Sequence, residues 1–282
     1  MSWTNEDLRC KIDIIILTDP TRHPEKLDNL LAGLCVENQE RVKAVLRDSW
    51  AFNMVERETW LTNAVVDSNF ESIAVLMSYG AKPLKVCPLK NNLCAFDMLA
   101  RHYHAQNRPR FYFLATLLNV GIPSNRNTGG YIAHNDHLFG SRPDDFFPDF
   151  DPNSGHEIYL FNADTALTFA VKNYLPYCVH WLIYGRGADV VQRSRNGMSL
   201  VALALECFPE RPPITAPSME HSLWAEKLEK WKKIIKILCE KGVSIPYSEY
   251  SQWNVLYGEG FEIYCNIISF NTKNKIKLLY NS

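Results

Sequence analysis

The sequence lacks a long apolar stretch and an excess of either charge. Its longest unbroken apolar run is the six residues 200–205, whereas a transmembrane helix needs about 18 or more. The charges nearly cancel, with 30 Lys and Arg against 31 Asp and Glu, and nucleic-acid-binding proteins normally carry a clear basic excess. We therefore expect neither a membrane-spanning segment nor a nucleic-acid partner.

The sequence also lacks closely spaced cysteines. None of its eight cysteines forms a C-x-x-C pair, and no N-x-[ST] glycosylation acceptor occurs. This excludes the usual spacings of zinc-ribbon and thioredoxin-type sites. Several cysteines, such as Cys178 and Cys239, stand among apolar residues, where a thiol behaves as a small buried hydrophobe. The sequence therefore predicts a reduced, intracellular protein of the cytoplasm.

Catalytic signatures with a fixed spacing are missing as well. The sequence contains no G-x-S-x-G, no G-x-x-x-x-G-K-[ST], no H-E-x-x-H and no helix-opening G-x-G-x-x-G. Nucleotide-dependent enzymes and zinc hydrolases are therefore disfavoured, and no cofactor is expected. A cofactor-free lyase, isomerase or cyclase would leave no such signature, so that class of enzyme stays open.

What the sequence does contain is an internal repeat. An ordered pattern of threonine, leucine, alanine, an apolar stretch and glycine runs from Thr59 to Gly80 and again from Thr165 to Gly187. The threonine can cap a first helix, and the glycine can take the left-handed conformation after a second helix. The pattern predicts a short helix, a tight turn, a second helix with an apolar face, and a glycine stop.

This pattern resembles the ankyrin repeat, a unit of about 33 residues that starts with T-P-L-H-x-A and closes its second helix with G-A-D. Weaker copies fit residues 30–46, 96–121 and 198–242. The proline of the family pattern is replaced by Trp60 and Ala166. The resemblance implies an all-α fold, namely an ankyrin-like helical repeat solenoid with an irregular insertion and a C-terminal cap. The alternative is a plain helical bundle in which the spacing is a coincidence.

The predicted organisation has five parts. They are an N-terminal cap (1–25), ankyrin-like repeats (26–121), an insertion (122–163), further repeats with a Pro-rich insertion at 207–222 (164–246), and a C-terminal cap (247–282). After the Pro-rich stretch, apolar side chains at 224, 228, 231, 235 and 238 predict one amphipathic helix. We expect this helix to be part of the core, with its lysines reaching solvent. Docking on a membrane or a partner is the alternative.

The insertion at 122–163 is acidic and aromatic. Between residues 131 and 160, six acidic residues stand against one arginine, a net charge of −5. Such loops are usually functional or disordered. The aromatic content favours folding back over the concave side of the repeats, and simple capping of a widened gap is the alternative. The candidate binding residues are Tyr131, His134, His137, Phe139, Asp144, Asp145, Phe146, Phe147, Asp149 and Phe150.

The two histidines of the insertion could bind a metal, but no further ligand stands at a fixed local spacing from them. Structural zinc sites also more often include cysteines. We therefore expect no metal site.

Two classes of function follow. In the first, the repeats and the acidic insertion recognise a partner protein or peptide, as most ankyrin-like proteins do. In the second, the insertion roofs a pocket in which a small apolar molecule is bound or converted without a cofactor. The first hypothesis is preferred, and whether the chain is an enzyme stays open.

Overall fold

A computed structural model describes residue 7, residues 24–48, 60–83, residue 95, and residues 108–118, 165–191 and 197–280. Helices dominate these ranges and no β-strand occurs within them, so the described part of the chain is all-α, as the sequence predicts. Within the same ranges, no helix combines the length and the apolar character that crossing a bilayer requires.

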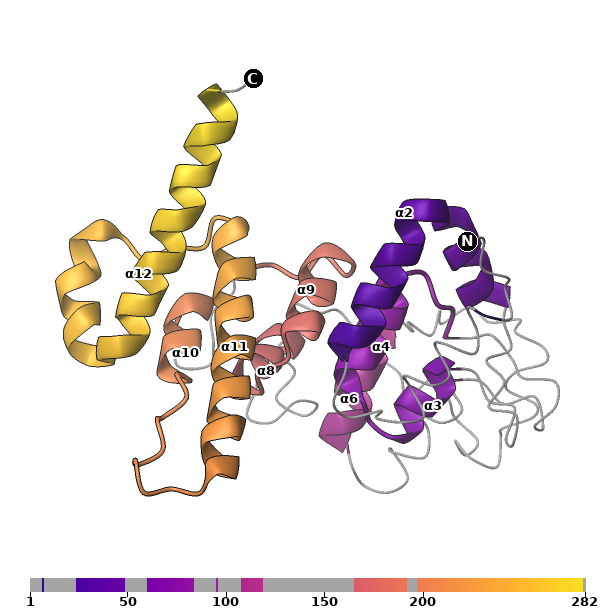
Figure 1. Cartoon of the computed structure of the whole chain (residues 1–282), viewed down its shortest axis with the longest axis horizontal. Helices are drawn as coiled ribbons and strands as arrows, with labels where there is room; N and C mark the ends of the chain where they lie inside the picture. Colours follow the sequence, from indigo (N-terminus) through magenta and orange to yellow (C-terminus); the bar gives the residue numbers. More distant parts are fainter. Residues whose placement is uncertain are drawn as a thin grey trace.

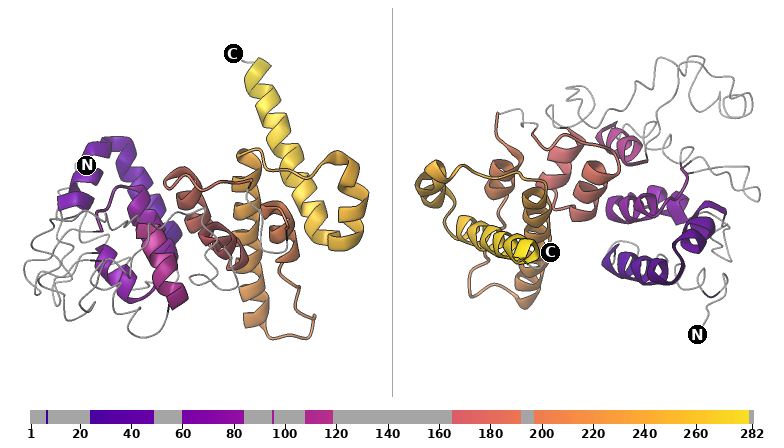
Figure 2. Two further views of the ribbon diagram at one scale, coloured as in Figure 1. Left: turned by 180° about the vertical axis from the view of Figure 1, so that it is seen from behind. Right: turned by 90° about the horizontal axis from the view of Figure 1, so that it is seen from above.

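Four helices follow one another side by side through the molecule (Figure 1). They are α2 (Pro24–Asp48), α4 (Phe70–Ser78), α9 (Pro176–Tyr184) and α11 (Ser218–Glu240). Helix α2 packs on α4, α4 packs on α9, and α9 packs on α11. The row thus connects the N-terminal helices with the C-terminal ones, and Figure 2 shows the same order from behind and from above.

Three shorter helices form pairs with members of this row. They are α3 (Trp60–Val66), α8 (Ala166–Lys172) and α10 (Leu200–Glu206). Each packs on the helix that follows it in the sequence, and α8 also packs on α10. Most of their described side chains are buried, and the exceptions include Val66, Lys172 and Glu206, each at or next to the end of its helix.

The first two helix pairs, α3–α4 and α8–α9, share the same local structure. Each has a first helix of seven residues and a second helix of nine. The turn between them contains a residue in the left-handed region in both pairs, Ser68 with φ 54° and Tyr174 with φ 55°. In both pairs the next residue donates its N–H back into the first helix, Asn69 to Ala64 at 2.8 Å and Leu175 to Ala170 at 3.0 Å.

The starts and stops predicted from the repeat pattern are confirmed where the structure describes them. The Thr165 side chain caps α8 by accepting the N–H of Thr168 at 3.2 Å, and Ser199 caps α10 in the same way. Gly80, Gly187 and Gly242 end the second helices with positive φ angles of 94°, 69° and 82°. Thr59 and Gly121, which belong to the same predicted pattern, lie outside the described residues.

Helix α6 (Arg108–Leu118) departs from a regular stack. As the second helix of the predicted copy at 96–121, α6 would separate α4 from α9, yet α4 packs directly on α9. The reason is an aromatic cluster: the buried Phe113 ring lies 4.9 Å from Phe70 of α4 and 4.6 Å from Phe169 of α8. These contacts hold α6 against the side of the row, between α4 and α8.

Helix α12 (Tyr250–Tyr280) packs on α10 and α11 at the opposite end from α2 (Figure 1). It bends sharply at Gly258, whose φ of 46° and ψ of −118° are not helical and suit a residue without a Cβ. Beyond the bend, Phe261 and Tyr264 are buried, and the Tyr264 hydroxyl accepts the N–H of Ile245 at 2.9 Å. This contact fixes α12 to the segment that follows α11.

The two left-handed turn residues allow a paired test of backbone strain. Replacing Ser68 with glycine should raise the free energy of unfolding by about 0.5–1 kcal/mol, because glycine takes φ 54° without the steric cost of a Cβ. Replacing Tyr174 with glycine should instead lower it by about 1–2 kcal/mol, because the Tyr174 hydroxyl donates to the Cys207 carbonyl and its half-buried ring packs on the core.

Urea unfolding of both variants measures this contrast. If both substitutions changed the free energy of unfolding in the same direction, the effect of Ser68 could not be assigned to backbone strain alone.

Candidate functional site

All ten binding residues predicted in the insertion lie outside the described residues. They are Tyr131, His134, His137, Phe139, Asp144, Asp145, Phe146, Phe147, Asp149 and Phe150. Their role in binding therefore stays a prediction, and so does the pocket that they were expected to roof. The described residues can show how the flanks of the insertion are held and which other surfaces and polar clusters the fold creates.

Both flanks of the insertion are attached to the core. The last carbonyls of α6 accept two hydrogen bonds from α9 and the turn after it, one from the Trp181 indole to Leu117 at 2.7 Å and one from Arg186 to Thr116 at 3.0 Å. Such carbonyls have no partner within their own helix. On the other side, Thr165 caps α8. The described residues on either side of 119–164 are therefore fixed in place.

No group of three or more His, Cys, Asp or Glu side chains with metal-binding geometry occurs within the described ranges. The expectation that the protein needs no metal is not tested by this result, because His134 and His137 lie elsewhere in the chain.

Three exposed apolar side chains lie on the loop before α11 and on the first turns of that helix. Ile214 is 97% exposed and Met219 is 71% exposed, and Leu223 follows one turn later on the same helix with about half of its surface exposed. We call these three residues the α11 ridge. Figure 1 shows that the loop and the start of α11, which carry these three residues, project beyond α10.

The α11 ridge is held rigidly at its base. The Trp224 indole donates to the Pro209 carbonyl at 3.1 Å, and the Arg211 guanidinium lies 5.6 Å from the centre of the Trp224 ring. The Ala216 N–H closes a turn by donating to Pro213 at 2.8 Å. Because the loop also contains four prolines, which fix φ, the ridge keeps its shape without help from Ile214 or Met219.

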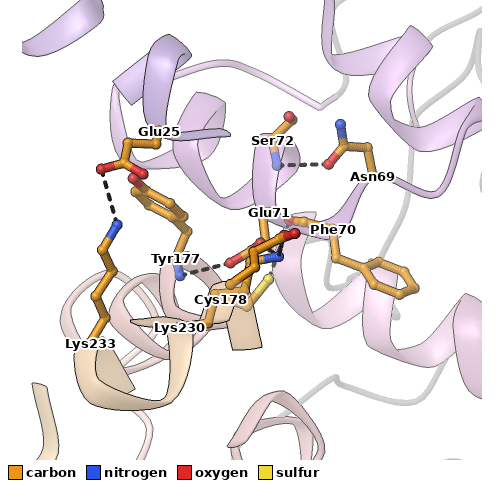
Figure 3. Close-up of polar contacts among 10 residues, drawn as sticks. Glu25, Asn69, Phe70, Glu71, Ser72, Tyr177, Cys178, Lys230 and Lys233 are labelled. Atoms are coloured by element: carbon orange, nitrogen blue, oxygen red, sulfur yellow. Dashed lines mark hydrogen bonds and ion pairs between the residues drawn. The ribbon is translucent and has the colours of Figure 1, made fainter. Parts of the chain in front are cut away.

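A second feature is a buried carboxylate where α4 meets α9 and α11 (Figure 3). Glu71, in the first turn of α4, is 7% exposed. One of its oxygens accepts the Tyr177 N–H at 3.5 Å, and the other lies 3.5 Å from the Lys230 ammonium. Because α9 has no side-chain cap of its own, a Glu71 oxygen supplies an acceptor for an N–H at the start of that helix, where such groups lack a partner within the helix.

Lysines of α11 complete this cluster. Lys230 also pairs with Glu226 at 3.0 Å, and Lys233 pairs with Glu25 of α2 at 3.2 Å while lying 5.9 Å from the centre of the Tyr177 ring. We call Glu71, Tyr177, Lys230 and Lys233 the Glu71 junction. Through Lys233 and Glu25 the junction reaches α2, so its contacts involve all four helices of the row.

Burial dominates the electrostatics of the Glu71 junction. It raises the pKa of the Glu71 carboxyl, and the Lys230 charge, the Tyr177 N–H and the Lys233 charge offset this only in part. Burial lowers the pKa of Lys230, but attraction to Glu71 and Glu226 outweighs burial and leaves that pKa above its usual value. A carboxyl with a raised pKa can serve acid–base chemistry, but both oxygens of Glu71 already face protein groups, so we interpret it as a structural group.

Burial also shifts the pKa values of two neighbouring groups on α9, Cys178 and His180. The Cys178 thiol donates to the Phe70 carbonyl at 3.3 Å, and burial raises its pKa well above the usual value. Burial lowers the pKa of His180, against the fields of Asp28 and Glu240. Cys178 is therefore a packing residue rather than a nucleophile, since nucleophilic cysteines need a lowered pKa and access to solvent.

The α11 ridge and Glu71 were not among the candidate residues predicted from the sequence, although each carries a signal there. Ile214 is an isolated apolar residue in a Pro-rich stretch, and Glu71 is an acid within the otherwise apolar helix FESIAVLMS. The position of Ile214 indicates that its side chain is exposed. The position of Glu71 indicates that its carboxylate has a partner in the core, but the sequence does not identify that partner.

Comparison with known proteins adds no relative: no protein-family model, no curated protein and no solved structure matches this chain.

Proposed function

We propose that this chain is a protein-recognition module whose helix pairs are divergent ankyrin-like repeats and whose α11 ridge inserts into an apolar groove of a partner protein. The observation that carries the proposal is the nearly complete exposure of Ile214 on a loop that is fixed at its base. A side chain that is 97% exposed contributes almost nothing to the core, so its place on a fixed projection supports a role in binding.

The two matching helix pairs support the repeat assignment. The pairs α3–α4 and α8–α9 agree in helix lengths, in the left-handed turn residue and in the glycine that follows the second helix. Stacks of such units commonly present extended binding surfaces. The fold alone does not define a function, which is why the proposal depends on the ridge.

The rigid base of the ridge also favours tight binding. Association usually loses free energy when loops and side chains become ordered, by about 0.5–1.5 kcal/mol for each flexible side chain. Prolines and the contact between Trp224 and Pro209 order this loop before any partner binds. A few side chains that fill pockets of the partner supply most of the binding energy of an interface, and we assign that role to the side chains of the ridge.

The charges near the ridge indicate the edge of the partner's groove. Glu210 and Glu220 are exposed and close to the ridge in the sequence, while the exposed Arg211 lies over the Trp224 ring. A basic rim around the partner's groove would complement the two glutamates and would speed association. The proposal places the protein in a reducing, intracellular compartment, supported by the free thiols of Cys178 and Cys239 in the core.

The enzyme hypothesis depends on His134, His137 and the aspartates of the insertion, which lie outside the described residues. Partner recognition is therefore the function that we advance.

A photo-crosslinking amino acid at position 219, followed by affinity measurement with the identified protein, tests the proposal. Replacing Ile214 and Leu223 together with aspartate should weaken binding of that protein by at least about tenfold, roughly 1.4 kcal/mol. Changing Glu210 and Glu220 to lysine should mainly slow association, and this effect should shrink at high salt.

The matched control is Val191→Asp, because Val191 is an apolar side chain that is 79% exposed but belongs to the turn after α9 and not to the ridge. It should leave binding unchanged, and circular dichroism should show all variants to be folded. The proposal fails if position 219 crosslinks to no protein, or if the Ile214 and Leu223 variant binds within about twofold of the original protein.

A further inference from the structure

The Glu71 junction joins the N-terminal helices to the C-terminal ones through a charge buried between them. We propose that Glu71 acts as a pH-responsive latch, in which protonation of its carboxyl group tightens the contact of α4 with α9 and α11 and ionisation loosens it. This inference is independent of the proposed recognition function, because it depends on the core of the molecule and not on the α11 ridge.

The position of Glu71 makes it the centre of this contact. Its carboxylate lies within 3.5 Å of both the Tyr177 N–H on α9 and the Lys230 ammonium on α11, and Figure 3 shows these groups converging on it from two helices. The pair of Glu25 and Lys233 also spans the contact, but both side chains are largely exposed, and such pairs contribute little.

Lys230 compensates the buried charge only in part. Both Glu71 contacts are at the long end of the hydrogen-bonding range, and Lys230 divides its charge between Glu71 and the exposed Glu226. The side chain of Lys230 is 31% exposed, so water also competes for it. A buried carboxylate that is paired in this way keeps much of its desolvation cost.

The charged and titratable groups that face Glu71 come from three helices. They are Tyr177 and Cys178 on α9, Lys230 and Lys233 on α11, and, through Lys233 and Tyr177, Glu25 and Asp28 on α2. The two lysines favour the ionised form of Glu71, whereas Glu25 of α2 and Glu226 of α11 each neutralise one of those lysines. Burial therefore remains the strongest influence on the pKa of the Glu71 carboxyl group.

The direction of the pH effect follows from linkage. Burial raises the pKa of Glu71 in the closed contact, whereas an open contact would return it to about 4.3. Between these two values the closed form binds a proton that the open form does not. The stabilisation is therefore fully present below the pKa of the open form and is lost as the pH rises through the pKa of the closed form.

Hydrogen–deuterium exchange of α9 and α11 amides tests the latch in the full-length chain. Exchange is measured at about pH 5.5 and about pH 7.5 and corrected for the intrinsic effect of pH. The original protein should open less at the lower pH, the direction that linkage gives for a carboxyl whose pKa is raised in the closed contact. Glu71→Gln, which keeps an oxygen acceptor without the charge, should hold the contact closed at both pH values.

Lys230→Met supplies the second test, because it leaves the Glu71 charge without its main partner. It should increase opening on the order of tenfold at neutral pH, and adding Glu71→Gln should reverse most of that increase. The matched control is Lys232→Met, which removes a lysine that pairs with the exposed Glu229 at 2.7 Å and should change little.

Two results would overturn the latch. One is a pH response of Glu71→Gln as large as that of the original protein, which would assign the response to other groups. The other is opening in Lys230→Met that Glu71→Gln does not reverse, which would mean that Lys230 acts by packing alone. If Lys230→Met does not fold, the comparison of Glu71→Gln with the original protein still tests the latch, because the first of these results would overturn it by itself.

Discussion

Replacing Trp231 with alanine is expected to lower the free energy of unfolding by about 4 kcal/mol, the range typical of a fully buried tryptophan. Trp231 lies in the middle of α11, where its ring meets Phe208 edge-on at 5.1 Å and its indole N–H donates to the Ala204 carbonyl at 2.6 Å. The variant would leave a cavity between α10 and α11 and a buried carbonyl at the end of α10 without its indole donor. Urea unfolding measures the loss.

A second substitution separates the indole hydrogen bond from ring packing. Trp231→Phe keeps an aromatic ring but removes the N–H, and should lower the free energy of unfolding by about 1–2 kcal/mol. The matched control is Trp253→Phe, because the Trp253 indole donates to an exposed Glu249 carboxylate, and its loss should be within about 0.5 kcal/mol. Equal losses in the two variants would show that the Ala204 contact does not stabilise α10.

Replacing Phe113 with alanine is also expected to lower the free energy of unfolding by about 4 kcal/mol. Its ring is fully buried and lies against Phe70 and Phe169, so it connects α6 with α4 and α8. Thermal unfolding should shift to lower temperature. Hydrogen–deuterium exchange should rise in α4 and α8 as well as in α6, because all three helices lose a shared contact.

Phe113→Leu is the control for volume and apolar character. It keeps most of the buried surface and should cost no more than about 1.5 kcal/mol. If Phe113→Ala increases exchange in α6 alone and leaves the unfolding midpoint unchanged, then α6 is an attachment to the row of helices and not part of its core.

The helical pairs were predictable because their signals are local. A threonine or serine before an apolar run, and a glycine after the next one, determine where a helix starts and stops through capping and backbone conformation. Thr165 and Gly187 confirm this prediction. The apolar seam of α11 was equally predictable, since Leu228, Trp231, Ile235 and Leu238 recur at helical spacing and are buried. This bears out the core interpretation for that part of the helix.

The start of α11 was less predictable. The helix begins at Ser218, so it includes the last residues of the stretch 207–222 that the sequence predicts as a Pro-rich insertion. Its first turns are exposed on most sides, and a periodic apolar pattern does not extend through them. The last proline of the stretch is Pro217, and α11 begins at the next residue. The last proline therefore locates the start of the helix better than the apolar pattern does, because helices tolerate proline at their start but not in their interior.

The placement of α6 and the pairing of Glu71 could not be derived from spacing. A repeat pattern indicates that helices stack in order, but the contact of α4 with α9 joins residues about 100 positions apart along the chain. Which of two apolar faces meets which neighbour depends on the shapes of Phe70, Phe113 and Phe169 together.

The sequence by itself determined the all-α class, the helix pairs and their capping and stop residues, because these depend on the conformational preferences of residues that are neighbours in the chain. Only the tertiary structure decided that α4 rests on α9, that a buried carboxylate of α4 meets groups of α9 and α11, and that Ile214 and Met219 stand exposed on a rigid projection. Those features depend on packing and desolvation among distant residues, and neither is encoded by local spacing.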